Sequence, residues 1–340
     1  MTTPSTCYAI VITMGDPAGI GPEIICRAVA AMSPAERATT LLVGDPAIYR
    51  RAARSIGAEL AFTPLDEAGE ATSVAVAIVE VPEDVEIPDG RISAGGGDMA
   101  FRCVETAVKL VQDGRARVIV TAPLNKAALH EAGHHYDGHT GMLAALTGAP
   151  SSFMLLASET LSTLHVSTHV SLRGAIERVT ETRIIDTVEA GHAHLVAMGV
   201  AKPRIAVAGL NPHCGEGGIF GDEDTRVIAP AVHTLKERGY AVSGPISADS
   251  VFYRASKGEF DLVVAQYHDQ GHIPVKLIAF DTTVNVSLGL PVQRTSVDHG
   301  TAFDIAWQGR ADATNMGSAI AYARRLSDVA AGAESRASQP

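Results

Sequence analysis

The chain has 340 residues, 46% of them apolar, and a formal net charge of −11. The acidic balance argues against general nucleic-acid binding, although a basic pocket inside an acidic protein can still hold a small anion. No stretch approaches the roughly 20 apolar residues of a membrane helix, no basic residue precedes the first apolar run, and the four cysteines form no Cys-x-x-Cys pair. We therefore expect a cytoplasmic protein with reduced cysteines, large enough for two lobes.

Short β-branched runs alternate with amphipathic stretches along the whole chain. The runs expected to form strands are Ile10–Thr13, Thr40–Val43, Val74–Val81, Val118–Thr121, Phe153–Leu156, Leu164–Ser167, Ile205–Ala208, Leu262–Ala265 and Val284–Ser287. Helical periodicity is clear in Met99–Gln112, Arg183–Met198, Arg226–Glu237 and Met316–Leu326. This alternation predicts an α/β fold with a largely parallel sheet and helices on both faces. Ligands usually bind at the carboxyl ends of such strands.

A glycine-rich segment, Met14–Glu23, directly follows the first expected strand. Its glycines, Gly15, Gly19 and Gly21, do not have the spacing of the Gly-x-Gly-x-x-Gly fingerprint of dinucleotide-binding turns. Pro22 suits the first position of a helix. The local pattern therefore predicts a strand-to-helix turn, and it fits a purely structural turn as well as a ligand-binding one.

Three of the thirteen histidines lie just beyond apolar strand candidates: His169, His213 and His268. If those strands end at one edge of the sheet, the three side chains can converge on one cleft. Three neutral imidazoles that leave one position open suit a divalent metal such as zinc. Their wide separation also leaves open that each is an ordinary surface or core histidine.

Basic and polar residues in the last third of the chain suggest an anion site. Lys276, Asn285 and Arg294 are spaced nine apart around a Gly-Leu-Pro turn, and Gly138-His-Thr140 can add neutral donors. A phosphate or carboxylate is bound well by a guanidinium together with an ammonium group. Solvated surface charge is the alternative. Cys214, beside His213, lacks the surroundings of a nucleophile and is expected to have a packing role.

Six segments carry a resemblance to a known family. They are Gly15-Asp-Pro-Ala-Gly-Ile-Gly-Pro-Glu23, Thr121-Ala-Pro-Leu-Asn-Lys126, Gly138-His-Thr140, Asn211-Pro-His-Cys-Gly-Glu-Gly-Gly218, Tyr267-His-Asp-Gln-Gly271 and Arg294-Thr-Ser-Val-Asp-His-Gly-Thr-Ala302. In this combination and order the chain resembles the 4-hydroxythreonine-4-phosphate dehydrogenase family of vitamin B6 synthesis. The resemblance runs from about residue 8 to about residue 328.

The resemblance implies a two-lobed α/β/α fold similar to isocitrate and isopropylmalate dehydrogenases, with the active site in the cleft between the lobes. We expect residues 1–130 and 300–330 in the first lobe, and a frayed tail at 331–340. Residues 131–299 would form the second lobe, with the metal and substrate residues and the dimer interface. The protein would be a homodimer with active sites completed across that interface.

The resemblance also implies a role for individual residues. One divalent metal (zinc, magnesium, cobalt or similar) would be bound by His169 from one subunit and by His213 and His268 from the other. Substrate contacts would come from His139, Thr140, Lys276, Asn285 and Arg294. NAD or NADP would bind at the His299–Asp304 loop, through His299, Gly300, Thr301 and Asp304. Candidate acid–base groups are Lys276, Asp249 and Asp269, with Asp269 favoured as the group that orients His268.

One departure from the family pattern bears on the substrate. The vitamin B6 enzymes typically continue His-Asp-Gln-Gly with Leu-Pro, whereas this chain reads Gly271-His-Ile-Pro-Val-Lys276. The segment Leu164–Arg173 is likewise similar to a sister branch, the 4-phospho-D-threonate and 4-phospho-D-erythronate dehydrogenases. A terephthalate-dihydrodiol dehydrogenase branch shares Gly-His-Ile-Pro but tends to lack the Gly-His-Thr and Arg-Thr-Ser-Val-Asp residues that are intact here. We therefore favour oxidation of the 3-hydroxyl of such a phospho-sugar acid, followed by decarboxylation to dihydroxyacetone phosphate.

Other functions remain as alternatives. A 4-hydroxythreonine-4-phosphate dehydrogenase would make the amino analogue of that product. A metal-dependent phosphate-ester hydrolase would use the same histidines and basic residues, but it leaves the His299–Asp304 loop unexplained. A non-catalytic sensor of sugar phosphates would be favoured if the metal ligands were missing, and none is.

Overall fold

The computed structural model describes residues 7–65, 75–82 and 85–337, with side chains up to residue 332. The chain divides into two compact units, Met1–Ser152 with Leu290–Pro340, and Phe153–Gly289. Residues 131–152 and 290–299, expected in the second lobe, thus belong to the first unit. Helix α6 (His139–Thr147) packs on α4 (Ala94–Gln112), and strand β12 (Gln293–Ser296) pairs with β5 (Ala116–Thr121). These contacts attach both segments to the first unit.

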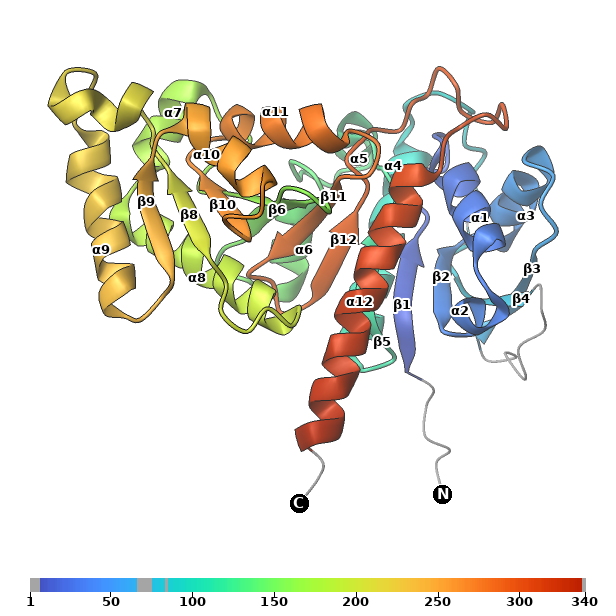
Figure 1. The fold of residues 1–340 in the computed structure, drawn as a ribbon. Coiled ribbons are helices and arrows are strands. Elements are labelled where there is room, and N and C mark those ends of the chain that lie inside the picture. Colours follow the sequence, from blue (N-terminus) through green and yellow to red (C-terminus); the bar gives the residue numbers. More distant parts are fainter. Residues whose placement is uncertain (1–6, 66–74, 83–84, 338–340) are drawn as a thin grey trace. The chain divides into compact units, whose positions relative to one another are not determined.

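The first unit contains six parallel strands in the order β3-β4-β2-β1-β5-β12 (Figure 1). The remaining bounds are β1 Tyr8–Thr13, β2 Thr40–Gly44, β3 Ala61–Pro64 and β4 Ala75–Glu80. The side chains of β2 are buried throughout, as are nearly all of those in β1 and β5. Such continuous apolar runs are typical of parallel strands with helices on both faces.

Helices cover this sheet. They are α1 Gly21–Ala31, α2 Pro34–Ala38, α3 Pro46–Ser55, α4, α5 Lys126–Glu131, α6 and α12 Thr314–Ala337. Helix α12 runs along β1 and β5 in Figure 1, and α4 packs on the same two strands. Helix α12 continues to Ala337, into the segment expected as a frayed tail from residue 331.

The second unit contains strands in the order β11-β6-β7-β10-β8-β9 (Figure 1). Their bounds are β6 Phe153–Ala157, β7 Thr163–His165, β8 Ile205–Ala208, β9 Val242–Ile246, β10 Leu262–Ala265 and β11 Val284–Leu288. Strand β6 is antiparallel to both of its neighbours, whereas β7, β10, β8 and β9 are parallel. The three histidines predicted to bind metal follow strands of this parallel part.

The helices of this unit are α7 Leu172–Arg178, α8 Glu181–Ala197, α9 Ala229–Glu237, α10 Ala248–Ser256 and α11 His268–Ala279. A tight turn at Pro212–Gly218 (η2) follows β8, and one π-helical turn at Asp224–Ile228 (η3) precedes α9. A buried cluster that includes Leu156, Val251, Val263 and Val275 joins α10 and α11 to the sheet.

The α/β prediction is confirmed, and β8 and β10 have the expected bounds. The other expected strands are found with ends shifted by one or two residues, and Val74 lies outside the described residues. Strands β3, β9 and β12 were not expected. Each is short, and their sequences Ala-Phe-Thr-Pro, Val-Ser-Gly-Pro-Ile and Gln-Arg-Thr-Ser lack an apolar run. No helix in the described ranges is long and apolar enough to cross a membrane.

Candidate active site

The three histidines predicted to bind metal follow strands that are neighbours in the sheet. Strand β10 is paired in parallel with β7 on one side and β8 on the other, so the carboxyl ends of these strands lie at one edge. His169 lies four residues beyond β7, His268 is the first residue of α11 after β10, and His213 lies in the turn after β8. The common edge expected from the sequence is therefore present.

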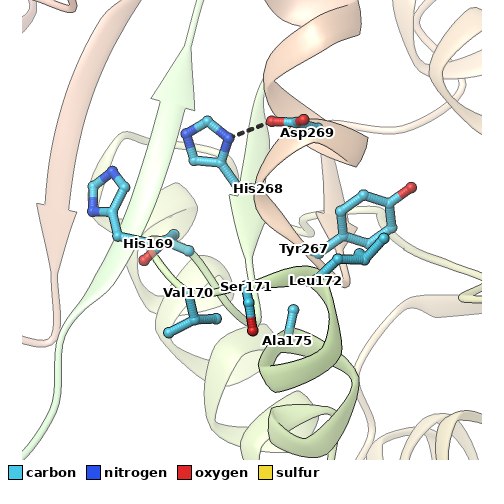
Figure 2. A pocket seen from close by; sticks show the side chains of 9 residues that line it. His169, Val170, Ser171, Leu172, Ala175, Tyr267, His268 and Asp269 are labelled. Carbon is cyan, nitrogen blue, oxygen red and sulfur yellow. Dashed lines mark hydrogen bonds and ion pairs between the residues drawn. The ribbon is translucent and has the colours of Figure 1, made fainter.

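A pocket of about 500 Å³ opens at this edge, within the second unit (Figure 2). It is lined by Thr168, His169, Val170, Ser171, Leu172, Ala175, Tyr267, His268 and Asp269. The ring centroids of His169 and His268 are 5.6 Å apart. Two imidazoles that share a tetrahedral metal, with metal–nitrogen distances of about 2 Å, have centroids roughly 5 Å apart. The pair therefore has the spacing of two ligands to one ion.

Asp269 orients the His268 ring. Its Oδ1 lies 2.7 Å from His268 Nδ1. A carboxylate only accepts, so Nδ1 carries the proton and Nε2 presents its lone pair. Figure 2 shows the other ring nitrogen of His268 on the side that faces His169. A carboxylate that holds the far nitrogen is the usual support of a metal-binding histidine, and this is the role that the sequence favoured for Asp269.

His213 stands on an unusual turn of left-handed backbone. The φ angles are +50° at His213, +55° at Cys214 and +44° at Glu216, a region that non-glycine residues rarely adopt. The buried Asp224 holds the entry to this turn: it accepts from the amides of Leu210 at 2.8 Å and Asn211 at 3.0 Å. The sequence analysis missed Asp224, because nothing local links it to residues thirteen positions earlier.

The Oδ2 atom of Asp249 lies 4.0 Å from His213 Nδ1. Within the described part of the chain, no three His, Cys, Asp or Glu side chains group as a metal site. One chain thus brings His169 and His268 together but not His213. The resemblance, in contrast, implies that His169 comes from one subunit and His213 with His268 from the other, whereas in this chain the His169 and His268 rings are 5.6 Å apart.

In the first unit, Arg294 and His139 form a second group. Arg294 lies on β12, is only 3% exposed, and donates from Nε and Nη2 to Thr121 Oγ1 at 3.0 and 2.6 Å. Burial lowers the pKa of Arg294 to about 9, still above neutral pH, so the guanidinium stays charged. Burial and the Arg294 charge hold the pKa of His139 well below its usual range. Such a buried cation favours an anionic ligand.

His139 is the first residue of α6, and its buried Nε2 has no hydrogen-bond partner among the described residues. Thr140 follows it and is half-buried. In the second unit, Lys276 lies on α11 with its Nζ 5.6 Å from the centre of the Phe280 ring, and Asn285 lies on β11. The buried Oδ1 of Asn285 likewise lacks a partner among the described residues. Unpartnered buried polar atoms are expected where a ligand supplies the missing hydrogen bonds.

The glycine-rich turn after β1 packs on the loop expected to bind the cofactor. The amide of Ile20 donates to the Thr301 carbonyl at 3.0 Å, and a Cβ on Gly19 would lie 2.7 Å from the same oxygen. Glycine at position 19 thus serves this close approach, which supports the structural interpretation of the turn. Because the turn engages Thr301, the exposed His299, Gly300 and Asp304 are the loop residues available to a ligand.

Asp16 and Cys214 complete the description. Burial raises the pKa of Asp16, in the glycine-rich turn, to about 6, and its Oδ1 accepts from the Ala18 amide at 3.0 Å. Burial and then the charges of Asp224 and Asp249 raise the pKa of the Cys214 thiol. A raised pKa keeps the thiol protonated and unreactive, as expected for a packing residue.

Comparison with known proteins agrees with these motifs. The family described as pyridoxal phosphate biosynthetic protein PdxA matches residues 36–323. The D-threonate 4-phosphate dehydrogenase of Cupriavidus necator is 46% identical, over 93% of this chain and 96% of its own length. The 4-hydroxythreonine-4-phosphate dehydrogenase of Beijerinckia indica is 42% identical, over 94% and 95%.

A solved structure shows the same fold over almost the full length. The 4-hydroxythreonine-4-phosphate dehydrogenase of Klebsiella pneumoniae aligns with a TM-score of 0.84 and 42% identity, covering 94% of this chain and 99% of its own. Together with the histidine edge and the Arg294 group, these matches show that the chain belongs to the PdxA family of dehydrogenases.

Proposed function

We propose that this protein is a divalent-metal-dependent and NAD(P)-dependent dehydrogenase of 4-phospho-D-threonate or 4-phospho-D-erythronate. It would oxidise the 3-hydroxyl and release the first carbon as carbon dioxide, leaving dihydroxyacetone phosphate. The observation that carries the metal chemistry is the His169–His268 pair, 5.6 Å apart, with Asp269 bonded to the far nitrogen of His268. The substrate class rests on the name of the Cupriavidus necator relative, which is 46% identical.

The metal would be held by His169, His268 and His213. The donor set of neutral imidazoles suits zinc or cobalt, and magnesium less well, because magnesium prefers oxygen ligands. When bound, a divalent ion supplies Lewis-acid polarisation of the hydroxyl and later of the ketone. Asp269 would keep the His268 lone pair directed at the ion, and Asp224 would hold the turn that presents His213.

Anion recognition would fall to Arg294, Thr121 and His139 in the first unit. The charged guanidinium binds a phosphate or carboxylate, and the neutral His139 donates from Nε2 without adding a second charge. Lys276 and Asn285 of the second unit would contact the remaining polar groups of the substrate. Because Asp269 is bonded to His268, Lys276 and Asp249 remain the candidates for moving the hydroxyl proton.

The cofactor would contact the exposed His299, Gly300 and Asp304, and the nicotinamide would accept the hydride from the third carbon. In a homodimer, each subunit would supply ligands to both metal sites, as the resemblance to the family implies. The isolated His169–His268 pair then gains its third imidazole from the partner.

A side-by-side turnover assay tests this proposal. The purified protein is given NAD or NADP, one divalent metal, and 4-phospho-D-threonate, 4-phospho-D-erythronate or 4-hydroxythreonine 4-phosphate, with nicotinamide absorbance as the readout. We expect metal-dependent turnover of the two phospho-sugar acids, and less turnover of the amino substrate. A hydroxyl and an ammonium differ by a full charge, so a pocket suited to one penalises the other.

The Beijerinckia indica relative keeps 4-hydroxythreonine 4-phosphate as the second candidate substrate. A clear preference for that substrate would assign the protein to vitamin B6 synthesis. Release of inorganic phosphate without nicotinamide reduction would point to a hydrolase. Full activity in a metal-stripped preparation would contradict the metal chemistry.

A further inference from the structure

Two buried histidines lie behind the metal-binding edge, and neither has a role in the proposed chemistry. His165 is the last residue of β7, and His272 lies one helical turn after His268 on α11; both are buried. His165 Nε2 and His272 Nδ1 are 3.1 Å apart, although the residues are 107 positions apart in the chain. This contact ties helix α11 to strand β7.

The surrounding carbonyl oxygens determine which nitrogen carries each proton. His165 Nδ1 lies 2.9 Å from the Met154 carbonyl oxygen, and His272 Nδ1 lies 3.0 Å from that of His268. A carbonyl only accepts, so both Nδ1 atoms carry hydrogen. The single His272 Nδ1–H is therefore shared between the His268 carbonyl and His165 Nε2, and both of these atoms accept. The two rings form a one-way chain of hydrogen bonds, from His272 through His165 to the backbone of β6.

The His272 end of this hydrogen-bonded pair contacts His268, the predicted metal ligand. The His272 ring is stacked on the His268 ring, with centroids 3.6 Å apart and planes 15° apart. Residues four apart on a helix face the same side, so α11 itself brings these rings together. The Asp269 carboxylate holds the His268 ring at Nδ1, and the stacked ring supports its face. Together these contacts restrict its rotation.

Gly271 makes room for this arrangement. A Cβ at position 271 would overlap His165 Nε2 and lie 3.0 Å from the Ala265 Cβ. The sequence Asp-Gln-Gly-His therefore places a residue without a side chain against the Nε2 edge of the His165 ring. Where the family pattern has Gly-Leu, this chain has Gly271-His272: His272 bonds to His165, and Gly271 leaves the space that the His165 ring occupies.

We propose that His165 and His272 are positioning residues that hold the metal ligand His268 in its binding orientation. The inference rests on the proposed metal site and adds two residues to it. His272 is only 6% exposed and faces His165 and His268, so it acts through His268.

The test uses His165→Leu, which removes the hydrogen bonds and keeps an apolar side chain in the buried site. His272→Phe is the second variant; it keeps a ring against His268 but cannot bond to His165. His165→Gln is the rescue, because its amide offers both an NH2 donor group and an acceptor oxygen. His194→Leu is the matched control: His194 is also buried in the second unit, on α8, and is 6% exposed like His272.

The first readout is the affinity of each metal-free protein for Zn²⁺, measured by competition with a chromophoric chelator well below the unfolding temperature. We expect His165→Leu and His272→Phe to bind zinc about ten- to hundredfold more weakly, the usual cost of losing outer support of a ligand. His165→Gln should recover most of the affinity, and His194→Leu should match the wild type.

The second readout needs no metal. The stacked His272 ring shifts the NMR signals of the His268 ring, which a His268→Gln spectrum identifies. We expect these signals to move toward free-histidine values in His165→Leu and to stay in place in His194→Leu. If the wild type binds zinc and both His165→Leu and His272→Phe bind it equally well, the positioning role is overturned.

A wild type that binds no zinc would instead contradict the proposed metal site. The NMR comparison still decides the positioning role in that case, since unchanged His268 signals in His165→Leu would refute it. If His165→Leu does not fold, His272→Phe tests the same link by zinc affinity.

Discussion

Replacing Asp224 by alanine should abolish metal-dependent activity at a modest cost in stability. This buried carboxylate accepts from the amides of Leu210 and Asn211 and from Asn211 Nδ2, the last at 3.0 Å. The turn that it holds contains His213, where φ is +50°. Without this carboxylate, the amides of Leu210 and Asn211 lose their acceptor, and only the Asn211 side chain stays held, by Glu223 at 2.7 Å; we expect the turn to relax and His213 to lose its orientation.

Two opposing terms set the magnitude. Hydrogen bonds to a charged group contribute about 1.5–3 kcal/mol each, so the contacts with Asp224 amount to several kcal/mol. The left-handed residues His213, Cys214 and Glu216 each cost roughly 1–2 kcal/mol, and that strain is released when the turn relaxes. The terms largely cancel, and we expect a net destabilisation of about 2 kcal/mol. The loss of zinc affinity should be larger, about a hundredfold, because one of three ligands is displaced.

The assay compares thermal unfolding and zinc affinity of Asp224→Ala with those of Asp222→Ala. Asp222 is exposed and pairs with Arg226 one turn along, so its removal should change the unfolding free energy by less than about 0.5 kcal/mol. It should leave zinc affinity unchanged. Wild-type zinc affinity in Asp224→Ala would refute the reasoning, because it would show that His213 keeps its orientation without the carboxylate or binds no metal.

Three further outcomes follow from the geometry. Arg294→Ala should raise KM for the phosphorylated substrate roughly thirtyfold or more, which corresponds to about 2 kcal/mol of lost binding free energy, and should raise KM for a dephosphorylated analogue much less. An equal rise in KM for both substrates would show that Arg294 does not bind the phosphate. Burial lowers the pKa of His194 to about 4 from 6.5, so the unfolded chain binds that proton more readily. The contribution of His194 to stability is complete above pH 6.5 and falls by up to about 1.4 kcal/mol per pH unit toward pH 4. His194→Leu should make the slope of pH-dependent unfolding shallower by about that amount, while the lowered pKa values of His139, His165 and His272 maintain the rest; an unchanged slope would contradict the assignment. If one chain supplies both His169 and His268 to a metal site, subunit exchange between His213→Ala and His268→Ala should restore roughly a quarter of wild-type activity, and exchange between His169→Ala and His268→Ala should restore none. The reverse result would support the division of ligands expected from the resemblance. A tag on one variant must first show that mixed dimers form.

Local sequence pattern was sufficient for much of the fold. The runs Ile205–Ala208 and Leu262–Ala265 are apolar, β-branched and followed by polar turns, so they could be assigned as buried strands with correct ends. Strand β12 could not, because Gln293, Arg294 and Thr295 carry no apolar pattern. It is a strand because β5 pairs with it, and a pairing partner more than 170 residues away leaves no local mark.

In the candidate site, too, some features could be predicted from the sequence and others only from the folded structure. The position of His169, His213 and His268 after apolar strands, and of Asp269 beside His268, could be predicted from chain order alone. Only the tertiary structure showed that His165 bonds to His272. Strand β7 and helix α11 are brought together by pairing and packing, and hydrogen bonds across such distances depend on atoms that meet only after the chain has folded.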